Sequence, residues 1–241
     1  MIVGLTGAPG TGKSYFLADQ AWKGFCAGKD VYSNFTWDYE LAVSCYGGRF
    51  GGPEPADESR DQLKNRLGRW FPIRSYQALC DVAEGVLLFD EAHLWAFSRN
   101  YRELPFELIF WWSQSRKRGV DVYFATQRWE SVDTMLRELA HYRVKCYRVL
   151  SGFSYRTEDP RLEKKMAFSG WRRLKMDPVV SSLYDTNEIL PPPGWEEGRP
   201  TAVGGGRQPV VAGGAAQQNG HRQLKGQGAR RASRHPVGRE S

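Results

Sequence analysis

The sequence predicts an α/β fold, in which a mainly parallel central sheet is flanked by helices and followed by a disordered basic tail. Three observations carry this prediction. Short apolar segments alternate with amphipathic ones along residues 1–190, a pattern typical of strands connected by helices. The segment Gly85–Phe89 is apolar throughout, as expected of a strand buried on both faces. Another apolar segment, Met1–Thr6, runs directly into a glycine-rich loop.

The first predicted helix follows that loop and extends from Lys13 to about Ala27. Its apolar residues recur at helical spacing, at Phe16, Leu17, Ala21 and Phe25. By the same criteria we expect strands at 31–34, 85–89, 120–126 and 144–150, and helices at 57–69, 75–83, 105–115 and 132–141. Residues 42–56, rich in glycine and proline, are expected to form a surface excursion, and 165–176 are compatible with an edge hairpin.

The positive charge of the chain is concentrated at its carboxyl-terminal end. Residues 199–241 contain eight of the 34 lysines and arginines and one of the 27 acidic residues, which accounts for the whole net charge of +7. This segment has no aromatic residue and too little apolar surface to offset its ordering entropy. We therefore expect a P-loop domain over 1–190 and, after the Pro191–Gly194 break, a Pro/Gly-rich linker and disordered tail over 191–241. The tail could serve only solubility, or act as an arm that binds DNA or another anionic surface.

Composition also excludes several classes of protein. No apolar run approaches the roughly 20 residues that span a bilayer, so we expect no transmembrane segment. The amino terminus lacks the pattern of a secretory signal. The four cysteines are too scattered for a zinc site or a disulfide framework and suit a reducing compartment; they are Cys26, Cys45, Cys80 and Cys146.

The glycine-rich loop matches the phosphate-binding pattern G-x-x-x-x-G-K-[ST]. Backbone N–H groups in such a loop surround a phosphate at the amino terminus of a helix, whose dipole favours anions. Lys13 would contact the β- and γ-phosphates, and the Ser14 hydroxyl would ligate Mg²⁺. The predicted ATP-binding residues are Gly7, Ala8, Pro9, Gly10, Thr11, Gly12, Lys13 and Ser14.

An acidic pair and a glutamine end the next two predicted central strands. Asp90 follows Gly85–Phe89 and is the second expected Mg²⁺ ligand. Glu91 is placed to polarise an attacking water, which suits hydrolysis better than phosphoryl transfer by a small-molecule kinase. Gln127 ends the strand 120–126 and should lie beside Glu91, where it could sense the γ-phosphate or orient water.

These segments resemble a known family. The sequence Ala125-Thr126-Gln127-Arg128, followed by Ser131-Val132-Asp133, is similar to the sensor segment of the FtsK–HerA group of DNA-pumping ATPases. Other segments resemble the zonula-occludens-toxin-like ATPases of filamentous phages, whose relatives include packaging ATPases of tailless, membrane-containing phages. These segments are Asp90-Glu91-Ala92-His93, Phe97, Arg99 and Arg116-Lys117-Arg118-Gly119-Val120-Asp121. The resemblance covers about residues 1–150.

The resemblance implies a RecA-like core that assembles into a ring, commonly a hexamer, with ATP bound between subunits. Such a site needs an arginine from the neighbouring subunit to stabilise charge that develops on the phosphate. The candidates are Arg99, Arg116 and Arg118. Filamentous-phage relatives usually carry a membrane-spanning segment after the ATPase domain. Because we expect none here, the sequence favours a soluble packaging motor, or an export ATPase that relies on a separate membrane partner.

The predicted function is therefore an ATP-hydrolysing motor that moves phage DNA, into a preformed capsid in the first interpretation. Its contacts with DNA would be to the phosphate backbone and independent of sequence. The second interpretation is assembly and export of a filamentous phage, and the third is a nucleotide-gated adaptor without catalysis. A capsid or membrane protein would be the partner. The expected location is the host cytoplasm, the membrane periphery or a virion vertex.

Overall fold

The structure is a computed structural model that describes residues 1–49, 60–96, 104–150, 152–160, 168–185 and 187–193. All of these residues lie in the first of the two compact units of the chain, Met1–Pro200. The predicted tail therefore falls almost wholly outside the described residues, and its disorder stays a prediction.

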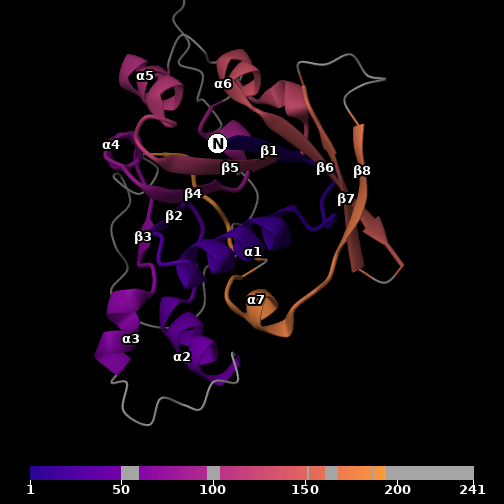
Figure 1. Cartoon of the computed structure of the whole chain (residues 1–241). Helices are drawn as coiled ribbons and strands as arrows, with labels where there is room; N and C mark the ends of the chain where they lie inside the picture. The colour runs from indigo at the N-terminus through magenta and orange to yellow at the C-terminus, as the bar shows by residue number, and fades with distance from the viewer. Residues whose placement is uncertain (50–59, 97–103, 151, 161–167, 186, 194–241) are drawn as a thin grey trace, which may run out of the picture. The chain divides into compact units, whose positions relative to one another are not determined.

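An eight-stranded sheet forms the centre of this unit (Figure 1), with strand order β3-β2-β4-β5-β1-β6-β7-β8. The neighbours from β3 to β6 pair in parallel, whereas β6, β7 and β8 pair antiparallel. The mainly parallel sheet predicted from the sequence is confirmed. The strands are β1 (Ile2–Thr6), β2 (Val31–Ser33), β3 (Trp70–Pro72), β4 (Gly85–Phe89), β5 (Val120–Thr126), β6 (Tyr142–Val149), β7 (Gly152–Glu158) and β8 (Phe168–Leu174).

Helices cover both faces of the parallel part of the sheet, as Figure 1 shows. One apolar cluster joins the sheet to α1 (Lys13–Cys26), α2 (Tyr39–Arg49), α3 (Arg60–Arg66) and α7 (Pro178–Ser182). A second cluster joins the opposite face to α4 (Tyr76–Cys80), α5 (Phe106–Gln114), α6 (Thr134–Leu139) and the short 3₁₀ helices η1 (Ala92–Leu94) and η3 (Trp129–Ser131). Within the described ranges, no helix combines the length and apolar character that crossing a bilayer requires.

This double covering explains why the central strands are so apolar. Every residue of β1 and β4 is buried, because each strand has helices on both sides. A strand in that position loses the alternation of polar and apolar residues that marks a half-exposed strand. The bounds predicted for 85–89 and 120–126 therefore agree with the structure to the residue.

Several segments differ from the prediction, among them α7, where no element was expected. The surface excursion expected at 42–56 is wrong for 42–49, which belong to α2; Ala42 and Val43 are buried in the core, and this burial outweighs the two glycines at 47 and 48. Residues 50–56 lie outside the described ones. The sequence analysis missed β3, which has three residues, and β7, which pairs with β8. The edge hairpin expected at 165–176 is thus β7–β8, of which the prediction included one strand.

Candidate nucleotide-binding site

The predicted site residues lie at one edge of the sheet, where β1, β4 and β5 end. In the strand order, β5 lies between β1 and β4 and pairs in parallel with both. The loop after β1, the acidic pair after β4 and Gln127 after β5 are therefore neighbours. This is the edge at which open α/β sheets bind ligands.

The loop between β1 and α1 needs its glycines for shape. Gly10 and Gly12 have φ angles of 73° and 87°, in the left-handed region that side chains rarely adopt. At Gly12 there is also no room, because a Cβ atom would lie 2.5 Å from the ring of Phe153 on β7. The loop then leads directly into the amino terminus of α1, so the positive end of the helix dipole faces the loop, and no acidic residue in the first turn of α1 offsets it.

Lys13 lies across this loop with its side chain buried. Its Nζ donates hydrogen bonds to the carbonyl oxygens of Gly7 at 2.9 Å and Ala8 at 3.1 Å. The residue is 6% exposed, so its ammonium group is largely removed from water at the position where the loop would hold a phosphate. A buried ammonium group whose hydrogen bonds go to neutral carbonyl oxygens keeps its charge for an anion.

Ser14 and Asp90 contact each other, as expected of two ligands of one Mg²⁺. The Ser14 hydroxyl donates to Oδ2 of Asp90, and the backbone N–H of Glu91 donates to Oδ1 at 2.8 Å. Burial raises the pKa of the Asp90 carboxyl, and these two hydrogen bonds oppose the shift. Hydroxyl and carboxylate oxygens are suitable Mg²⁺ ligands when phosphates and water complete the coordination. A cation there would favour the ionised form of Asp90.

Asn34, at the end of β2, fixes the backbone of Asp90. Its side-chain amide donates to the carbonyl of Asp90 and its amide oxygen accepts from the N–H of Asp90, both at 2.8 Å. Both residues are buried. Sequence analysis missed Asn34, although a polar residue directly after a short apolar strand was an available signal. Its part in the site is to hold the backbone of Asp90, and with it the carboxylate, in place.

Glu91 and Gln127 lie side by side, as their positions in the sequence predicted. Nε2 of Gln127 donates to Oε1 of Glu91 at 3.1 Å, and Nδ1 of His93 lies 3.3 Å from Oε2. The backbone of Glu91 is left-handed, with φ 46° and ψ 48°, an unfavourable conformation for glutamate. Strain of this kind is concentrated at functional sites. The catalytic roles assigned to Glu91 and Gln127 stay predictions.

Two of the three candidate arginines lie away from this edge. Arg116 and Arg118 precede β5, at the opposite edge of the sheet, and Nη1 of Arg118 donates to the carbonyl of Cys80 at 2.9 Å. Neither can reach the phosphate loop of its own chain. Arg99 lies outside the described residues. A role for Arg116 or Arg118 would have to be in the site of a neighbouring subunit.

A hollow of about 370 Å³ adjoins the loop on the β6 side. Its walls are the loop residues Thr6, Gly7, Ala8 and Thr11, and the β6 residues Arg143, Lys145, Cys146, Tyr147 and Arg148. Sequence analysis did not place the basic residues of β6 near the nucleotide. The signal available was a basic residue at 143, 145 and 148 of one strand, but the order of the strands was needed to interpret it.

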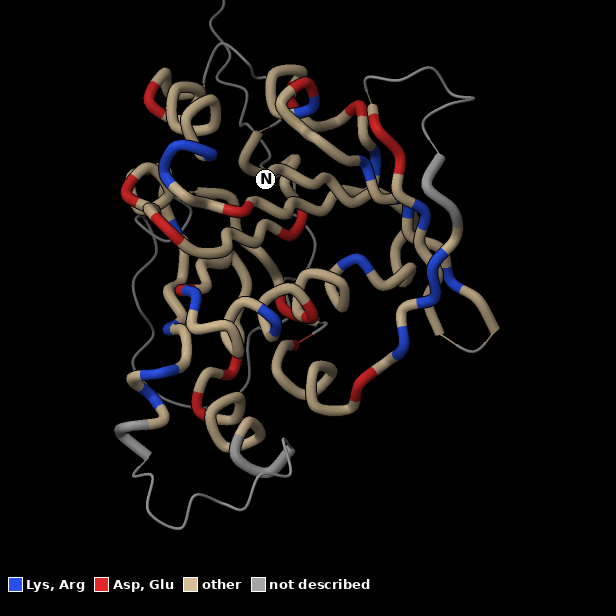
Figure 2. The backbone as a smooth tube through the Cα atoms, in the orientation of Figure 1, with Lys and Arg blue, Asp and Glu red and all other residues tan. Residues whose placement is uncertain are grey.

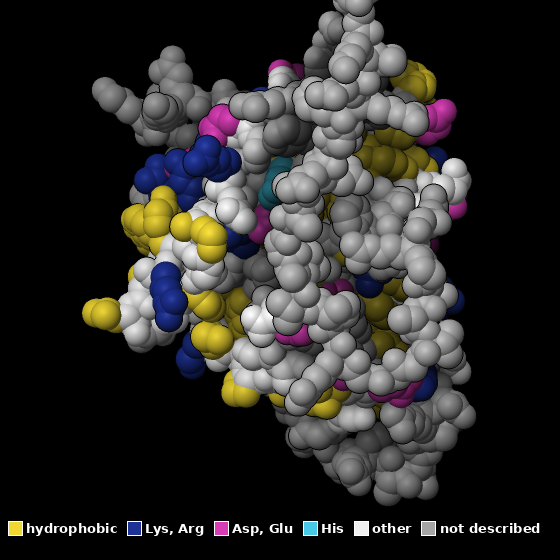
Figure 3. All heavy atoms as spheres, turned by 180° about the vertical axis from the view of Figure 1, so that it is seen from behind, with side chains coloured by type: hydrophobic (Ala, Val, Ile, Leu, Met, Phe, Trp, Pro, Cys, Tyr) yellow, Lys and Arg dark blue, Asp and Glu magenta, His cyan; other side chains and the backbone are white. Residues whose placement is uncertain are grey.

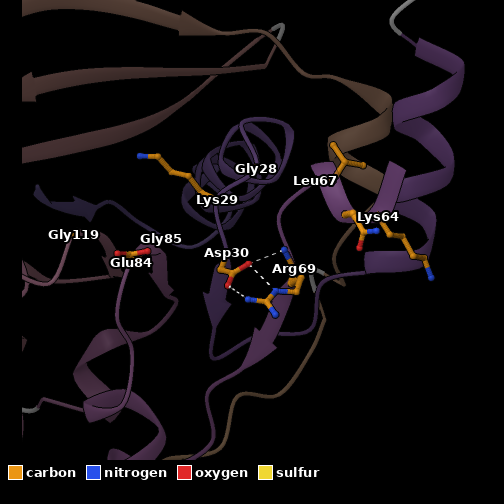
Figure 4. Close-up of a pocket in the computed structure, with 10 residues that line it drawn as sticks. Gly28, Lys29, Asp30, Lys64, Leu67, Arg69, Glu84, Gly85 and Gly119 are labelled. Atoms are coloured by element: carbon orange, nitrogen blue, oxygen red, sulfur yellow. Dashed lines mark hydrogen bonds and ion pairs between the residues drawn. The ribbon is translucent and has the colours of Figure 1, made fainter. Parts of the chain in front are cut away.

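A larger hollow, of about 560 Å³, lies at the other edge (Figure 4). Residues at or just before the starts of β2, β4 and β5 line it, among them Lys29, Asp30 and Gly85. Its carboxylate Asp30 accepts from Nε and Nη2 of Arg69 at 3.2 and 2.7 Å. Because this carboxylate already has a cation as partner, we assign the nucleotide to the smaller hollow. The predicted phosphate loop borders that hollow, and Asp90 meets the loop through Ser14.

Comparison with known proteins agrees with the resemblance noted in the sequence. The N-terminal domain of zonular occludens toxin from Neisseria meningitidis has 18% identity and a TM-score of 0.47, over 76% of this chain and 98% of that chain. The genome packaging NTPase of Sulfolobus turreted icosahedral virus 2, in complex with ATP-gammaS, has 14% identity and a TM-score of 0.44, over 73% and 98%. No curated protein matches the chain. The family model for zonular occludens toxin (Zot) matches residues 1–187. The chain therefore belongs to the Zot family.

Proposed function

We propose that this protein is an ATP-hydrolysing motor that moves phage DNA during virion assembly. The observation that carries the proposal is the convergence of three pairs of groups at one edge of the sheet. Lys13 lies on the loop carbonyls, Ser14 is bonded to Asp90, and Gln127 is bonded to Glu91. Phosphate binding, metal binding and water activation are the three functions that hydrolysis of ATP needs.

In this proposal Glu91 is the general base. Its carboxylate accepts a proton from the attacking water, whose oxygen bonds to the γ-phosphorus while the bond to the bridging oxygen breaks, which yields ADP and phosphate. Gln127 orients Glu91 through the hydrogen bond between them, and Lys13 stabilises the phosphate oxygens. Ser14 and Asp90 would hold Mg²⁺, which supplies further neutralisation of the phosphate charge.

The proposal includes a ring of subunits, with an arginine of one subunit at the phosphate of the next. Arg116 and Arg118 support it by their position, since they lie far from the loop of their own chain and are thus available to another. A ring would enclose DNA and contact its phosphates, so movement would not depend on sequence.

Two tasks are consistent with such a motor. Packaging into a preformed capsid, the first interpretation of the sequence, stays a prediction. Assembly and export of a filamentous phage is the second candidate, and membership of the Zot family favours it. The form of DNA that stimulates hydrolysis distinguishes the tasks, because a filament exporter would respond to the strand that it extrudes.

The decisive experiment is ATP hydrolysis by the full chain with no DNA, with single-stranded DNA and with duplex DNA. We expect DNA to stimulate turnover. In Glu91→Gln, turnover should fall by about a hundredfold or more while ATP binding persists, because the general base is lost and the phosphate contacts remain. A wild-type protein that binds ATP and does not hydrolyse it under any condition would instead support the adaptor. Loss of ATP binding in Glu91→Gln would contradict the role of this residue.

A further inference from the structure

The antiparallel extension β6–β8 has one face that points away from α1. Its other face packs on α1, where the ring of Tyr155 meets that of Phe16 at 5.3 Å. Side chains alternate along a strand, so Ser154 and Arg156, which flank Tyr155 on β7, point away from α1. In Figure 2, lysine and arginine segments gather along these three strands.

Cations predominate on this second face, which we call the basic face. Lys145 lies directly opposite Arg156, and Arg173 lies opposite Ser154. Like charges placed opposite each other on paired strands are destabilising. The members of the basic face that the argument uses are Arg143, Lys145, Tyr147, Arg156, Trp171 and Arg173.

One carboxylate, Glu158, serves two of these cations. Its oxygens lie 3.2 Å from Nζ of Lys145 and 2.7 Å from Nη2 of Arg156, and the residue is nearly buried. A single charge cannot neutralise two, and Arg143 and Arg173 add two more cations. Among the described residues, the face therefore keeps an excess of positive charge, which favours a polyanion as its partner.

The basic face also presents an aromatic pair. The rings of Tyr147 on β6 and Trp171 on β8 are 4.9 Å apart, and Trp171 is 58% exposed. Seen from behind (Figure 3), hydrophobic and basic side chains are interspersed on the side of the molecule that these strands occupy. An exposed ring among cations provides a surface on which an unpaired base can stack.

The basic face begins at the nucleotide site. Arg143, Lys145 and Tyr147 line the hollow beside the phosphate loop, and the rest of the face extends from there to the edge strand β8. A polymer bound along it would pass from the edge of the sheet to the wall of the nucleotide pocket.

We propose that the basic face binds single-stranded DNA, with phosphates at its arginines and lysine and a base stacked on Trp171. Cations spaced along strands suit a polyanion, and an exposed ring selects a strand whose bases are unpaired. This proposal rests on the proposed function, since it names the form of DNA and the surface that contacts it.

Neighbouring arginines on β8 offer a matched test. Arg173 belongs to the basic face, whereas Arg172 is paired with Tyr155 and lies on the face toward α1; both are exposed. The affinity of the full-length chain for a fluorescent single-stranded oligonucleotide is measured at several salt concentrations. Arg173→Gln should weaken binding and make the slope of log affinity against log salt shallower by about 0.7, the value for one phosphate contact. Arg172→Gln should change neither.

The aromatic ring is tested separately. Trp171→Ala should weaken single-strand binding by about tenfold, and Trp171→Phe should retain most of the affinity because it keeps a ring. Duplex of the same length should bind more weakly than the single strand and respond little to Trp171→Ala. Circular dichroism and light scattering of each variant check its fold and oligomeric state.

Several outcomes would overturn the inference. Equal effects of Arg172→Gln and Arg173→Gln would mean that only net charge matters. An unchanged affinity in Trp171→Ala would exclude stacking, and dissociation of oligomers by Arg173→Gln would identify the basic face as a contact between subunits. If DNA stimulates hydrolysis in all variants as in the wild type, this inference fails and the proposed function stands. If the wild-type chain neither binds DNA nor responds to it, both fail.

Discussion

The parallel strands begin at one side of the sheet, the amino-end edge, and end at the other, the carboxyl-end edge. The carboxylates at these two edges have different partners. At the amino-end edge, Asp30 is bonded to the guanidinium of Arg69, and this bond lowers the pKa of the Asp30 carboxyl despite an opposing effect of partial burial. At the carboxyl-end edge, Asp90 is almost fully buried, bonds to a hydroxyl and a backbone N–H, and has a raised pKa. The Asp30 carboxylate thus has a guanidinium as its hydrogen-bond partner, whereas the Asp90 carboxylate is bonded to uncharged groups. The size of a hollow is thus a poorer guide to the site than the state of its carboxylates.

The largest expected effect is on ATP hydrolysis, when a lysine is replaced by alanine at the carboxyl-end edge and, as a control, at the amino-end edge. Lys13→Ala should reduce ATP hydrolysis by a hundredfold or more, on the order of the loss when a transition-state contact is removed. Lys29→Ala removes the same charge at the other edge, where Lys29 is half-exposed and bonded to Asp121 at 3.0 Å, and should leave hydrolysis unchanged. Steady-state phosphate release measures both. Similar losses in the two variants would contradict the assignment of the site.

The next largest effect, on nucleotide affinity, is expected from replacing a glycine by alanine in the phosphate loop. Gly12 and Gly28 have φ angles of 87° and 74°, so alanine costs about 1–2 kcal/mol of backbone strain at either position. Gly12→Ala should in addition lose nucleotide binding, because its Cβ would overlap the ring of Phe153. Gly28→Ala should lower the unfolding temperature and keep the nucleotide affinity. Titration of each variant with a fluorescent ATP analogue measures its nucleotide affinity and so distinguishes Gly12→Ala from Gly28→Ala.

Phe153→Ala provides the control for that experiment. It removes the ring that a Cβ at Gly12 would overlap, so Gly12→Ala combined with Phe153→Ala should bind nucleotide better than Gly12→Ala alone. No gain in the double variant would mean that the backbone conformation, and not the overlap, decides binding.

Asn34→Ala should have an intermediate effect. It leaves a buried N–H and a buried carbonyl of Asp90 without partners, which costs about 1–3 kcal/mol of stability for each group. The magnesium dependence of hydrolysis should shift to higher metal concentration, since Asp90 is no longer fixed. Asn65→Ala, at an exposed position of α3, is the control and should alter neither quantity. A loss of stability with an unchanged magnesium dependence would limit Asn34 to a structural role.

The smallest expected effect belongs to the amino-end edge. Because the pKa of Asp30 is lowered in the folded state, its ion pair stabilises the fold above the ordinary pKa of 3.8, and this contribution is lost as the pH falls through the folded pKa. Asp30→Asn should therefore lower the unfolding temperature slightly at pH 7, where the pair is exposed and screened. The difference from wild type should disappear in acid. A difference that persists in acid would show that the carboxylate charge is not its cause.

The sequence predicted the nucleotide edge better than the extension beyond it. Residues 7–14, Asp90, Glu91 and Gln127 were predicted because phosphate binding and catalysis restrict residue types at fixed spacing. β7 and the position of Arg148 were not, since their place depends on pairing between strands rather than on local pattern. The helix over 42–49 was missed for the same reason, because contacts with the core decided a segment whose local residues favour a loop.

Phe153 connects the phosphate loop with the strand that carries part of the basic face. Its ring lies against Gly12 of the phosphate loop, while Arg156, on the same strand, belongs to the basic face. The carbonyl of Cys146 on β6 is equally close to Gly7, leaving no space for a side chain there. A shift of the loop around a phosphate must therefore displace the hairpin or be resisted by it. The phosphate loop and strands β6 and β7 are thus packed so closely that the rigidity of these two strands limits how far the loop can move toward them.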